Sequence, residues 1–224
     1  MKYLSFLIVC SCLLLSHPAF TQNVNEAAEP RVNGAGTIDL LKDGTLDAWK
    51  VPSHWHLVNG IIIGETGTGK LTAPEWIYTK QRFSNFEFTC EMRLTGDSHR
   101  NTGIYYRVNT FLFRNRYEAP SGYEFDAAAT GDNLNGSVGD WYARPQLRIS
   151  ADSAIVNKIY NSDNWNRMTL RARGNRLEYW INGVKIMDFQ DPDPKGSREG
   201  IIGFQMHDGA VMKAEYRNIR VLPL

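Results

Sequence analysis

The fold of this chain is decided by a stretch of strict alternation, Phe86-Glu87-Phe88-Thr89-Cys90-Glu91-Met92-Arg93-Leu94. Successive side chains of a β-strand point to opposite faces, so this stretch would have one apolar face and one polar face. The pattern predicts a half-buried strand of an antiparallel sheet. Similar alternation recurs in residues 101–108, 122–126, 165–173, 177–181 and 200–207.

Hairpin turns separate these expected strands. Asn59-Gly60 lies between two apolar runs and Asn182-Gly183 lies between two alternating segments, and both dipeptides are typical of two-residue β-turns. Downstream of the leader, no stretch shows helical periodicity over about ten residues. We therefore predict an all-β fold, a two-sheet antiparallel β-sandwich of the jelly-roll kind.

The first residues have the character of a secretory signal. Lys2 precedes an apolar run, residues 4–15, and a small-residue exit follows, with a cut expected before Gln22. The run is too short to cross a bilayer, so we predict no integral membrane span. The location that this leader predicts is secreted or periplasmic in a bacterium. Cys10 and Cys12 leave a lipid anchor open as an alternative.

The leader also sets the expected division of the chain. We predict a signal peptide at 1–21, a flexible tether at 22–36 and a single domain at 37–224. Cys90 is then the only cysteine left, so no internal disulfide can form. Its apolar neighbours favour a buried, inert thiol over a reactive one.

Charge and motifs argue against three kinds of partner. The net charge of +1 falls to zero when the leader with Lys2 is removed, which gives no electrostatic basis for binding nucleic acid or an anionic membrane. Gly64, Gly69 and Lys70 have the spacing of a phosphate loop. However, Leu71 stands where a hydroxyl must reach magnesium, so we expect no nucleotide cofactor.

Two carboxylates share a strand face between Gly122 and Asp126. Alternation sends Tyr123 and Phe125 to one face and puts Glu124 and Asp126 side by side on the other. For one carboxylate alone, the ordinary interpretation is a solvated strand face. If the polar strand faces lie in one sheet, which sequence alone does not establish, they gather Glu91, Arg93, Asn101, Arg107, Glu124, Asp126, Gln205 and His207.

This set has the composition of a sugar-binding surface. Arg, Asp, Glu, Asn and Gln bind hydroxyl groups in a fork, histidine titrates near neutral pH, and lysine is absent. A glycine in mid-strand, Gly103, often marks a place where something approaches the backbone closely. The long irregular connection 127–164 carries Trp141, Tyr142 and Arg144, and we interpret it as a loop that walls a binding site for a small carbohydrate.

The motifs also resemble a known family when they are taken in order. They are Leu40-Leu41-Lys42-Asp43-Gly44 to Trp49, Gly69-Lys70-Leu71-Thr72, Asn85-Phe86-Glu87-Phe88 with Glu91 and Arg93, Asn101-Thr102-Gly103-Ile104 with Arg107, Gly122-Tyr123-Glu124, Asn164-Trp165-Asn166, Trp180-Ile181-Asn182-Gly183, Gly203-Phe204-Gln205 with His207, and Arg217-Asn218-Ile219. The set resembles the 3-keto-disaccharide hydrolase family, long catalogued as a domain of unknown function, across essentially the whole mature domain. The resemblance implies a concanavalin A-like fold and cleavage of glycosides already oxidised at C3, by hydrolysis or by elimination across C1 and C2.

The resemblance further implies residue roles. A ketone at C3 acidifies the hydrogen on C2, so a base can remove it, and the resulting enolate expels the aglycone at C1. By match to the family's motifs, Glu124 and His207 are the acid and the base, in an order that stays open. Arg107 would steady the oxyanion together with Gln205. The residues expected to bind substrate are Glu91, Asn101 and Tyr142 from the family match, with Asp126, Gln205 and Trp141 from the strand faces and the loop.

Asp126 departs from the family pattern, which commonly has Gln at this position. A carboxylate here could act as a metal ligand or raise the pKa of its neighbour through like-charge proximity. Glu124, Asp126 and His207 could together hold a divalent metal ion, but they lack a tight ligand spacing, so the need for a metal cofactor stays open. Two other function classes remain open: a non-catalytic carbohydrate-binding sandwich module, and a structural or partner-binding domain with these groups scattered over different surfaces.

Overall fold

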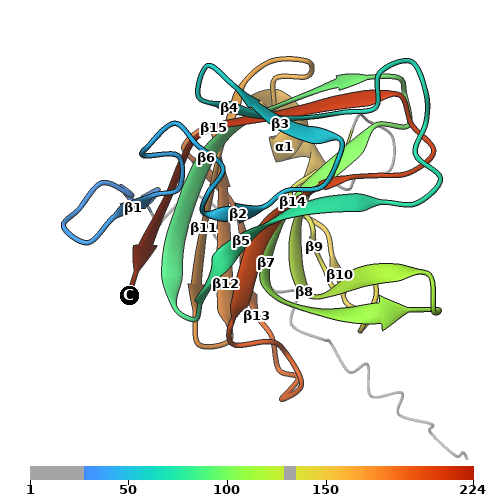
Figure 1. Ribbon diagram of the computed structural model, residues 1–224. Coiled ribbons are helices and arrows are strands. Elements are labelled where there is room, and N and C mark those ends of the chain that lie inside the picture. The colour runs from blue at the N-terminus through green and yellow to red at the C-terminus, as the bar shows by residue number, and fades with distance from the viewer. Residues whose placement is uncertain (1–27, 129–134) are drawn as a thin grey trace, which may run out of the picture.

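Two antiparallel sheets packed face to face make up the protein, in a computed structural model that describes residues 28–128 and 135–224 (Figure 1). The predicted all-β sandwich is confirmed. The expected signal peptide, with Cys10 and Cys12, lies outside the described residues.

The strands form an eight-stranded sheet, here sheet A, and a seven-stranded sheet, here sheet B. In spatial order, sheet A contains β13 (Val184–Gln190), β12 (Arg176–Ile181), β11 (Asn166–Arg173), β6 (Phe86–Gly96), β15 (Met212–Pro223), β4 (Ile61–Glu65) and β3 (Trp55–Val58), and β1 (Ile38–Asp39) pairs with β15. Sheet B contains β10 (Arg148–Ile149), β9 (Val138–Gly139), β8 (Tyr117–Ala128), β7 (Asn101–Phe113), β14 (Gly200–Met206), β5 (Glu75–Phe83) and β2 (Trp49–Lys50).

Both hairpins expected from Asn-Gly turns are present. Asn59 and Gly60 connect β3 to β4 with φ of 50° and 74°, and Asn182 and Gly183 connect β12 to β13 with φ of 50° and 92°. Two consecutive residues with positive φ match the right-handed twist of the flanking strands, which is why these dipeptides make tight hairpins.

Aromatic rings join the two sheets across the core. Phe204 of sheet B stacks on Tyr216 of sheet A with ring centroids 3.7 Å apart, and Phe125 stacks on Tyr179 at 4.1 Å. The hydroxyls of Tyr106 and Tyr179 also meet across the sheets at 2.6 Å, so these buried polar atoms are satisfied inside the core. The apolar face of each alternating strand therefore points inward, as expected, and the polar face points outward.

Strand β6 corrects the expectation that all the polar strand faces share one sheet. It pairs with β11 and β15 in sheet A, so the outward side chains of Glu91 and Arg93 face away from those of sheet B. Glu91 accepts a hydrogen bond from Arg217 Nε at 2.6 Å, and Arg93 pairs with Glu215. These two residues belong to an ion-paired solvent face.

A β-bulge corrects the placement of Arg107. The register of β7 against β8 shifts between Tyr106 and Asn109, and Arg107 itself has a φ of 52°. This break in the alternation buries the Arg107 side chain, whose guanidinium donates to the carbonyl oxygens of Ser84 at 2.7 Å and Gly174 at 2.6 Å. It also moves Val108 into a small outer cluster with Tyr105.

The described part of the expected tether, residues 28–36, contacts the sandwich. Val32 is buried, and the carboxylate of Glu29 accepts hydrogen bonds from Arg167 Nε at 2.9 Å and from the Thr169 hydroxyl at 2.6 Å. This segment therefore contacts sheet A, where the sequence predicted a free linker.

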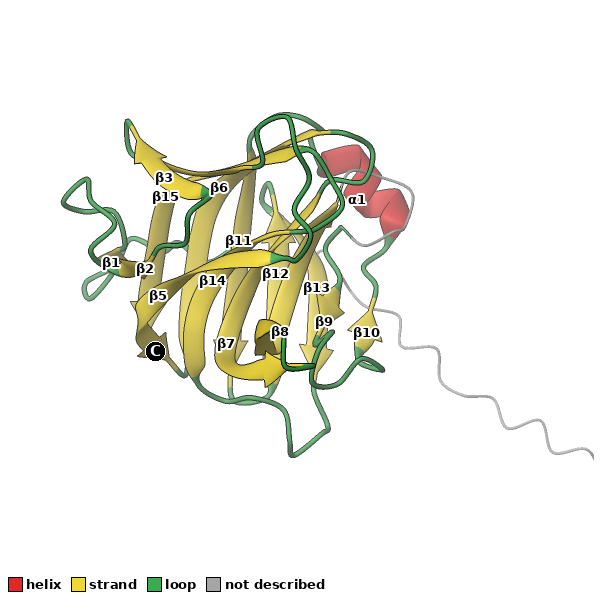
Figure 2. Ribbon diagram, turned by 45° about the vertical axis from the view of Figure 1, so that its right-hand side comes forward, coloured by secondary structure: helices red, strands yellow, loops and turns green. Residues whose placement is uncertain are grey.

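The connection between β8 and β11 contains short elements of its own. Besides β9 and β10 it holds α1 (Ser153–Ile159), which is capped by the side chain of Asp152 accepting from the backbone N–H of Ala154 at 2.8 Å. Figure 2 shows α1 at one end of the two strand layers. In the described part of the chain, no helix is both long and apolar enough to cross a membrane.

Candidate active site

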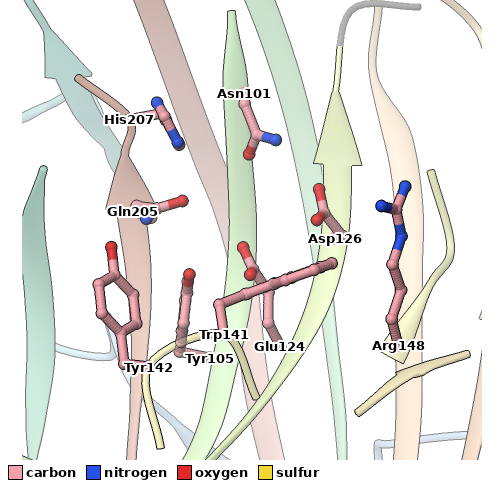
Figure 3. A pocket seen from close by; sticks show the side chains of 9 residues that line it. All are labelled: Asn101, Tyr105, Glu124, Asp126, Trp141, Tyr142, Arg148, Gln205 and His207. Carbon is pink, nitrogen blue, oxygen red and sulfur yellow. The ribbon is translucent and has the colours of Figure 1, made fainter. Parts of the chain in front are cut away.

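A pocket of about 390 Å³ opens on the face of sheet B that points away from the core. Figure 3 shows side chains from β7, β8, β14 and the loop after β9 converging on it. The lining residues are Asn101, Tyr105, Glu124, Asp126, Trp141, Tyr142, Arg148, Gln205 and His207.

Gly103 makes the floor of this pocket hollow. In the β7–β8 register, Gly103 pairs with Asp126 and Tyr105 pairs with Glu124, and continuing the β14–β7 register sets Gln205 on the other side of Gly103. A Cβ at position 103 would lie only 2.1 Å from Glu124 Oε1. The close approach predicted for this mid-strand glycine is therefore that of the Glu124 carboxylate.

Glu124 and Asp126 form a pair of buried carboxyls, each 2% exposed. The side chains of Tyr105 and Trp141 lie beside the Glu124 carboxyl group, and that of Asn101 lies beside the Asp126 carboxyl group. Glu124 Oε1 and Asp126 Oδ1 nevertheless have no hydrogen-bond partner within the described residues. Buried oxygens of this kind are costly in the free protein and ready to bind the hydroxyl groups of a ligand.

Burial changes the protonation of the two carboxyls. Burial, reinforced by neighbouring Asp126, raises the pKa of Glu124 well above its ordinary value. Burial also raises the pKa of Asp126, to about 8, although Asn101 and the positive charge of Arg148 act in the opposite direction. These shifts favour the protonated form of the two carboxyl groups, which is the form a general acid requires.

The imidazole of His207 has one nitrogen fixed by the backbone. Nδ1 lies 2.7 Å from the carbonyl oxygen of Asp208, which can only accept, so Nδ1 carries the hydrogen in the neutral ring. In that tautomer, Nε2 carries the lone pair. Figure 3 shows the ring at the pocket's edge beside Asn101 and Gln205, and its side chain is 45% exposed. This geometry suits a base that can exchange its proton with solvent.

The loop after β9 supplies the pocket's outer wall. Trp141 lies across the pocket in Figure 3, and the guanidinium of Arg148 lies 5.6 Å from its ring centroid. Gly139 makes room for this ring, because a Cβ there would lie 2.5 Å from Trp141 Cε2. The third wall residue is Tyr142.

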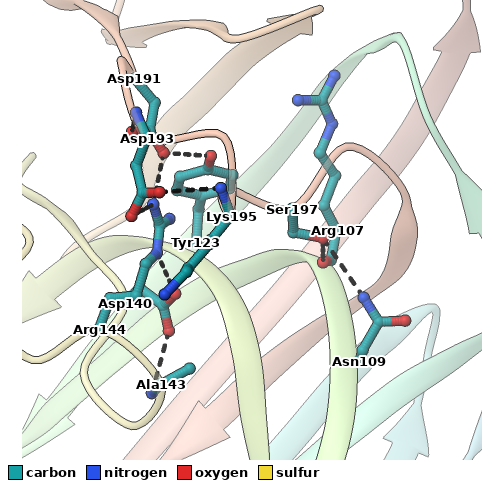
Figure 4. Close-up of polar contacts among 10 residues, drawn as sticks. All are labelled: Arg107, Asn109, Tyr123, Asp140, Ala143, Arg144, Asp191, Asp193, Lys195 and Ser197. Carbon is teal, nitrogen blue, oxygen red and sulfur yellow. Dashed lines mark hydrogen bonds and ion pairs between the residues drawn. The ribbon is translucent and has the colours of Figure 1, made fainter.

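Buried ion pairs hold this wall in place. Arg144 pairs with Asp140 of its own loop and with Asp191 of the loop after β13, each at 2.8 Å (Figure 4). The Tyr123 hydroxyl donates to the same Asp191 carboxylate at 2.6 Å. Burial lowers the pKa of the Arg144 guanidinium, but the two ion pairs raise this pKa by more, so the group stays charged. Arg144, expected at the binding site, thus supports the wall from behind.

Most residues predicted for the site meet in the pocket. Those that line it are Glu124, His207, Asn101, Asp126, Tyr142, Gln205 and Trp141. Arg107 and Glu91 do not line it, because the bulge in β7 buries Arg107 and because Glu91 lies on the outer face of sheet A. Figure 4 shows Ser197, whose hydroxyl donates to the carbonyl oxygen of Arg107 at 2.6 Å.

Two lining residues were missed by sequence reasoning. Tyr105 shares the outward parity of Asn101 and Gly103, so the alternation was a sufficient signal for it. Arg148 lies in a two-residue strand with no periodicity around it, and no local pattern marks it. It is the cation that the pocket contains in place of Arg107.

A metal ion does not fit the carboxylate and imidazole groups of this site. Within residues 28–128 and 135–224, no three His, Cys, Asp or Glu side chains converge closely enough to hold one, and this includes the set Glu124, Asp126 and His207.

Solved structures with the same fold are numerous. One glycosyl hydrolase of Parabacteroides distasonis ATCC 8503, provisionally assigned as such, aligns with a TM-score of 0.62 and 20% identity over 84% of this chain and 94% of its own. A second from the same organism gives 0.60 and 19%, over 84% and 99%. The carbohydrate recognition domain of Emp47p gives 0.55 and 14%, over 84% and 95%. At these identities, the likeness establishes the fold alone.

Family comparison is more specific than structural likeness. Among curated proteins, none matches the chain. The family model of the 3-keto-alpha-glucoside-1,2-lyase-like domain matches residues 36–222, which is nearly the whole described sandwich. This carbohydrate-acting protein therefore belongs to the 3-keto-alpha-glucoside-1,2-lyase-like family.

Proposed function

We propose that this protein cleaves glycosides whose sugar carries a ketone at C3, releasing the group at C1 by elimination or by hydrolysis. The observation that carries the proposal is the meeting of a proton-holding carboxyl pair, Glu124 and Asp126, with the free Nε2 of His207 in one polar pocket. Family membership supports the same chemistry.

His207 is the base in this mechanism. Nε2 takes the proton from C2 of the sugar, and the electrons of the C2–H bond move toward the C3 ketone to give an enolate. The enolate oxygen needs positive or hydrogen-bonding groups, and Arg148 and the Gln205 amide supply them from the pocket lining.

The carboxyl pair is the acid. As the enolate re-forms the ketone, the bond between C1 and the glycosidic oxygen breaks, and Glu124 gives its proton to that oxygen. The products are an alcohol and a sugar with a double bond between C1 and C2. Addition of water across that double bond would complete a net hydrolysis. Asp126 Oδ1 and Asn101 Oδ1, buried and unpaired among the described residues, would bind the sugar hydroxyls.

The test is release of the aglycone from a purified 3-keto-glucoside. We expect turnover by the wild type, and a fall in kcat/KM of about 100-fold to 10,000-fold in Glu124→Gln and His207→Gln. Glu91→Gln is the matched control, because Glu91 lies in sheet A away from the pocket, and we expect it to retain activity.

Two results would count against the proposal. One is absence of release at any pH and with any added divalent ion. The other is unchanged turnover in both pocket variants. Sugar binding without cleavage would instead indicate a carbohydrate-binding module.

We also propose export of the protein, from the leader seen in the sequence. The expected mature N-terminus is Gln22, to be checked by mass spectrometry of the secreted or periplasmic protein.

A further inference from the structure

The β7–β8 hairpin extends beyond the bulge as an arm, residues 109–120. In its register Phe113 pairs with Tyr117 and Phe111 pairs with Ala119, so these side chains share one face. The ring centroids of Phe111 and Phe113 lie 6.1 Å apart, and those of Phe113 and Tyr117 lie 5.8 Å apart. One face of the arm is therefore a row of aromatic rings, and Leu112 belongs to the opposite face.

This row joins the pocket at Tyr142. The Tyr142 ring lines the pocket and lies 5.2 Å from the ring of Phe113 and 6.4 Å from that of Tyr117. Trp76 of β5 lies beneath, 5.6 Å from Tyr142 and 6.1 Å from Tyr117. We call the five rings of Trp76, Phe111, Phe113, Tyr117 and Tyr142 the aromatic wall.

The aromatic wall differs in chemistry from the pocket beside it. The pocket lining offers carboxylates, amides and a guanidinium, which bind hydroxyl groups. The wall offers mainly aromatic ring surface, with the hydroxyls of Tyr117 and Tyr142 among its few polar groups, and Phe113, Tyr117 and Tyr142 are partly exposed. Phe111 at its outer end is 37% exposed, so the wall continues past the pocket into solvent.

Two buried donors at the base of the wall have no partner in the described part of the chain. They are Trp76 Nε1 and the Tyr78 hydroxyl, on side chains of residues only 6% and 8% exposed. Unsatisfied buried donors destabilise the free protein, and they commonly mark a place where a ligand supplies the acceptor. An oxygen substituent on a ligand that reaches past the edges of the rings would supply this acceptor.

We propose that the aromatic wall is the leaving-group subsite, and that it selects glycosides with a planar aromatic aglycone over those whose leaving group is a second sugar. The inference rests on the proposed function of the adjoining pocket. A sugar leaving group could lay its C–H face on the rings, but the hydroxyls around its edge would find no forked hydrogen-bonding partners there, whereas a planar aromatic group stacks on the rings without needing any.

The experiment compares two substrates of the same anomeric configuration, 4-nitrophenyl 3-keto-glucoside and methyl 3-keto-glucoside. The quantity measured is the ratio of their kcat/KM values. In Phe113→Ala we expect this ratio to fall about threefold to tenfold relative to the wild type, the equivalent of one lost aromatic contact. Leu112→Ser, on the opposite face of the same arm, is the matched control and should leave the ratio unchanged.

A binding measurement separates failure of this subsite from failure of the proposed reaction. Titration with 4-nitrophenol, followed by calorimetry, should give weaker binding to Phe113→Ala than to the wild type or Leu112→Ser, whether or not cleavage occurs. The subsite is refuted if 4-nitrophenol binds all three proteins equally. It is also refuted if the wild type prefers a 3-keto-disaccharide to the aryl glycoside.

Discussion

On the pocket floor, the side chain of Glu124 occupies the space that a side chain at position 103 would need. A methyl group at position 103 would come within 2.1 Å of Glu124 Oε1, far inside van der Waals contact. The carboxylate would therefore have to move, while the other lining residues would keep their places. A displacement of about 1 Å at a reacting group costs on the order of 100-fold in rate.

We therefore predict that Gly103→Ala lowers kcat/KM on a 3-keto-glucoside by about 100-fold while the protein still folds. The measurement is steady-state kinetics together with the melting temperature. Gly69→Ala is the control, because the nearest atom to a Cβ there is 3.9 Å away. Full activity in Gly103→Ala would mean that Glu124 does not need its present position.

The raised pKa of Asp126 has a consequence for stability. Between the ordinary aspartate pKa near 4 and the folded value of about 8, the folded protein holds a proton that the unfolded chain has released. Unfolding then releases a proton, so rising pH favours the unfolded state and stability falls through this window. An amide at position 126 removes this penalty.

We predict that Asp126→Asn is more stable than the wild type, and that its advantage grows from pH 5 to pH 8 by about 1 to 3 kcal/mol. The check is urea unfolding of both proteins at several pH values. Asp43→Asn, at an exposed position, should change the free energy of unfolding by less than about 0.5 kcal/mol. A wild type that gains stability over Asp126→Asn as the pH rises would contradict the buried-carboxyl account.

Arg107 is a residue whose position the alternation pattern predicted wrongly. Alternation placed Glu124, Asp126, Gln205 and His207 on the outward face, and these side chains do line the pocket. The same rule failed for Arg107, because an extra residue in β7 shifts the register between Tyr106 and Asn109. Bulges depend on how a strand pairs with its neighbour, and that pairing is not written in the strand's own pattern.

The loop after β9, which carries Trp141 and Tyr142, depends on the buried guanidinium of Arg144. The Arg144 side chain is 8% exposed and pairs with Asp140 and Asp191, whose side chains are almost fully buried. Removing the cation would leave these two carboxylates without charge compensation.

Arg144→Met should therefore lower the free energy of unfolding by about 3 kcal/mol. We also expect faster amide hydrogen exchange in residues 139–148, with a raised KM because the wall contacts substrate. Arg176→Met is the matched control: Arg176 is 54% exposed in its pair with Asp188, and such pairs contribute less than about 1 kcal/mol. Equal effects of the two substitutions would show that the loop does not depend on Arg144.

Strand membership was harder to predict than strand existence. The alternation of residues 86–94 correctly predicted β6 as a half-buried strand. Its partners, β11 and β15, lie far along the chain, and nothing local distinguishes the outward face of one sheet from that of the other. Glu91, which the match to the family's motifs predicted at the site, belongs to the opposite side of the molecule.

The pocket is formed by segments that lie far apart in the sequence. Only the ordered set of family motifs predicted that these segments belong to one site. Residues from β7, β8, β14 and the loop after β9 form one pocket, while local patterns could supply only the faces of separate strands. Arg148 is an example of a pocket residue that local patterns could not predict. Its position follows from the packing of the β9–β10 pair on the edge of sheet B. Packing of this kind becomes visible only in three dimensions.

The buried Cys90 thiol can report how often the two sheets separate. The residue is 1% exposed, unpaired, and set in the central strand β6 with its side chain in the core. In a protein produced from Gln22 onward it is the only thiol, so an aromatic disulfide reagent can label it only when the two sheets separate. The labelling rate at rising urea concentration should therefore follow global opening. A bound ligand should lower the labelling rate of Cys90 by the factor that its affinity predicts.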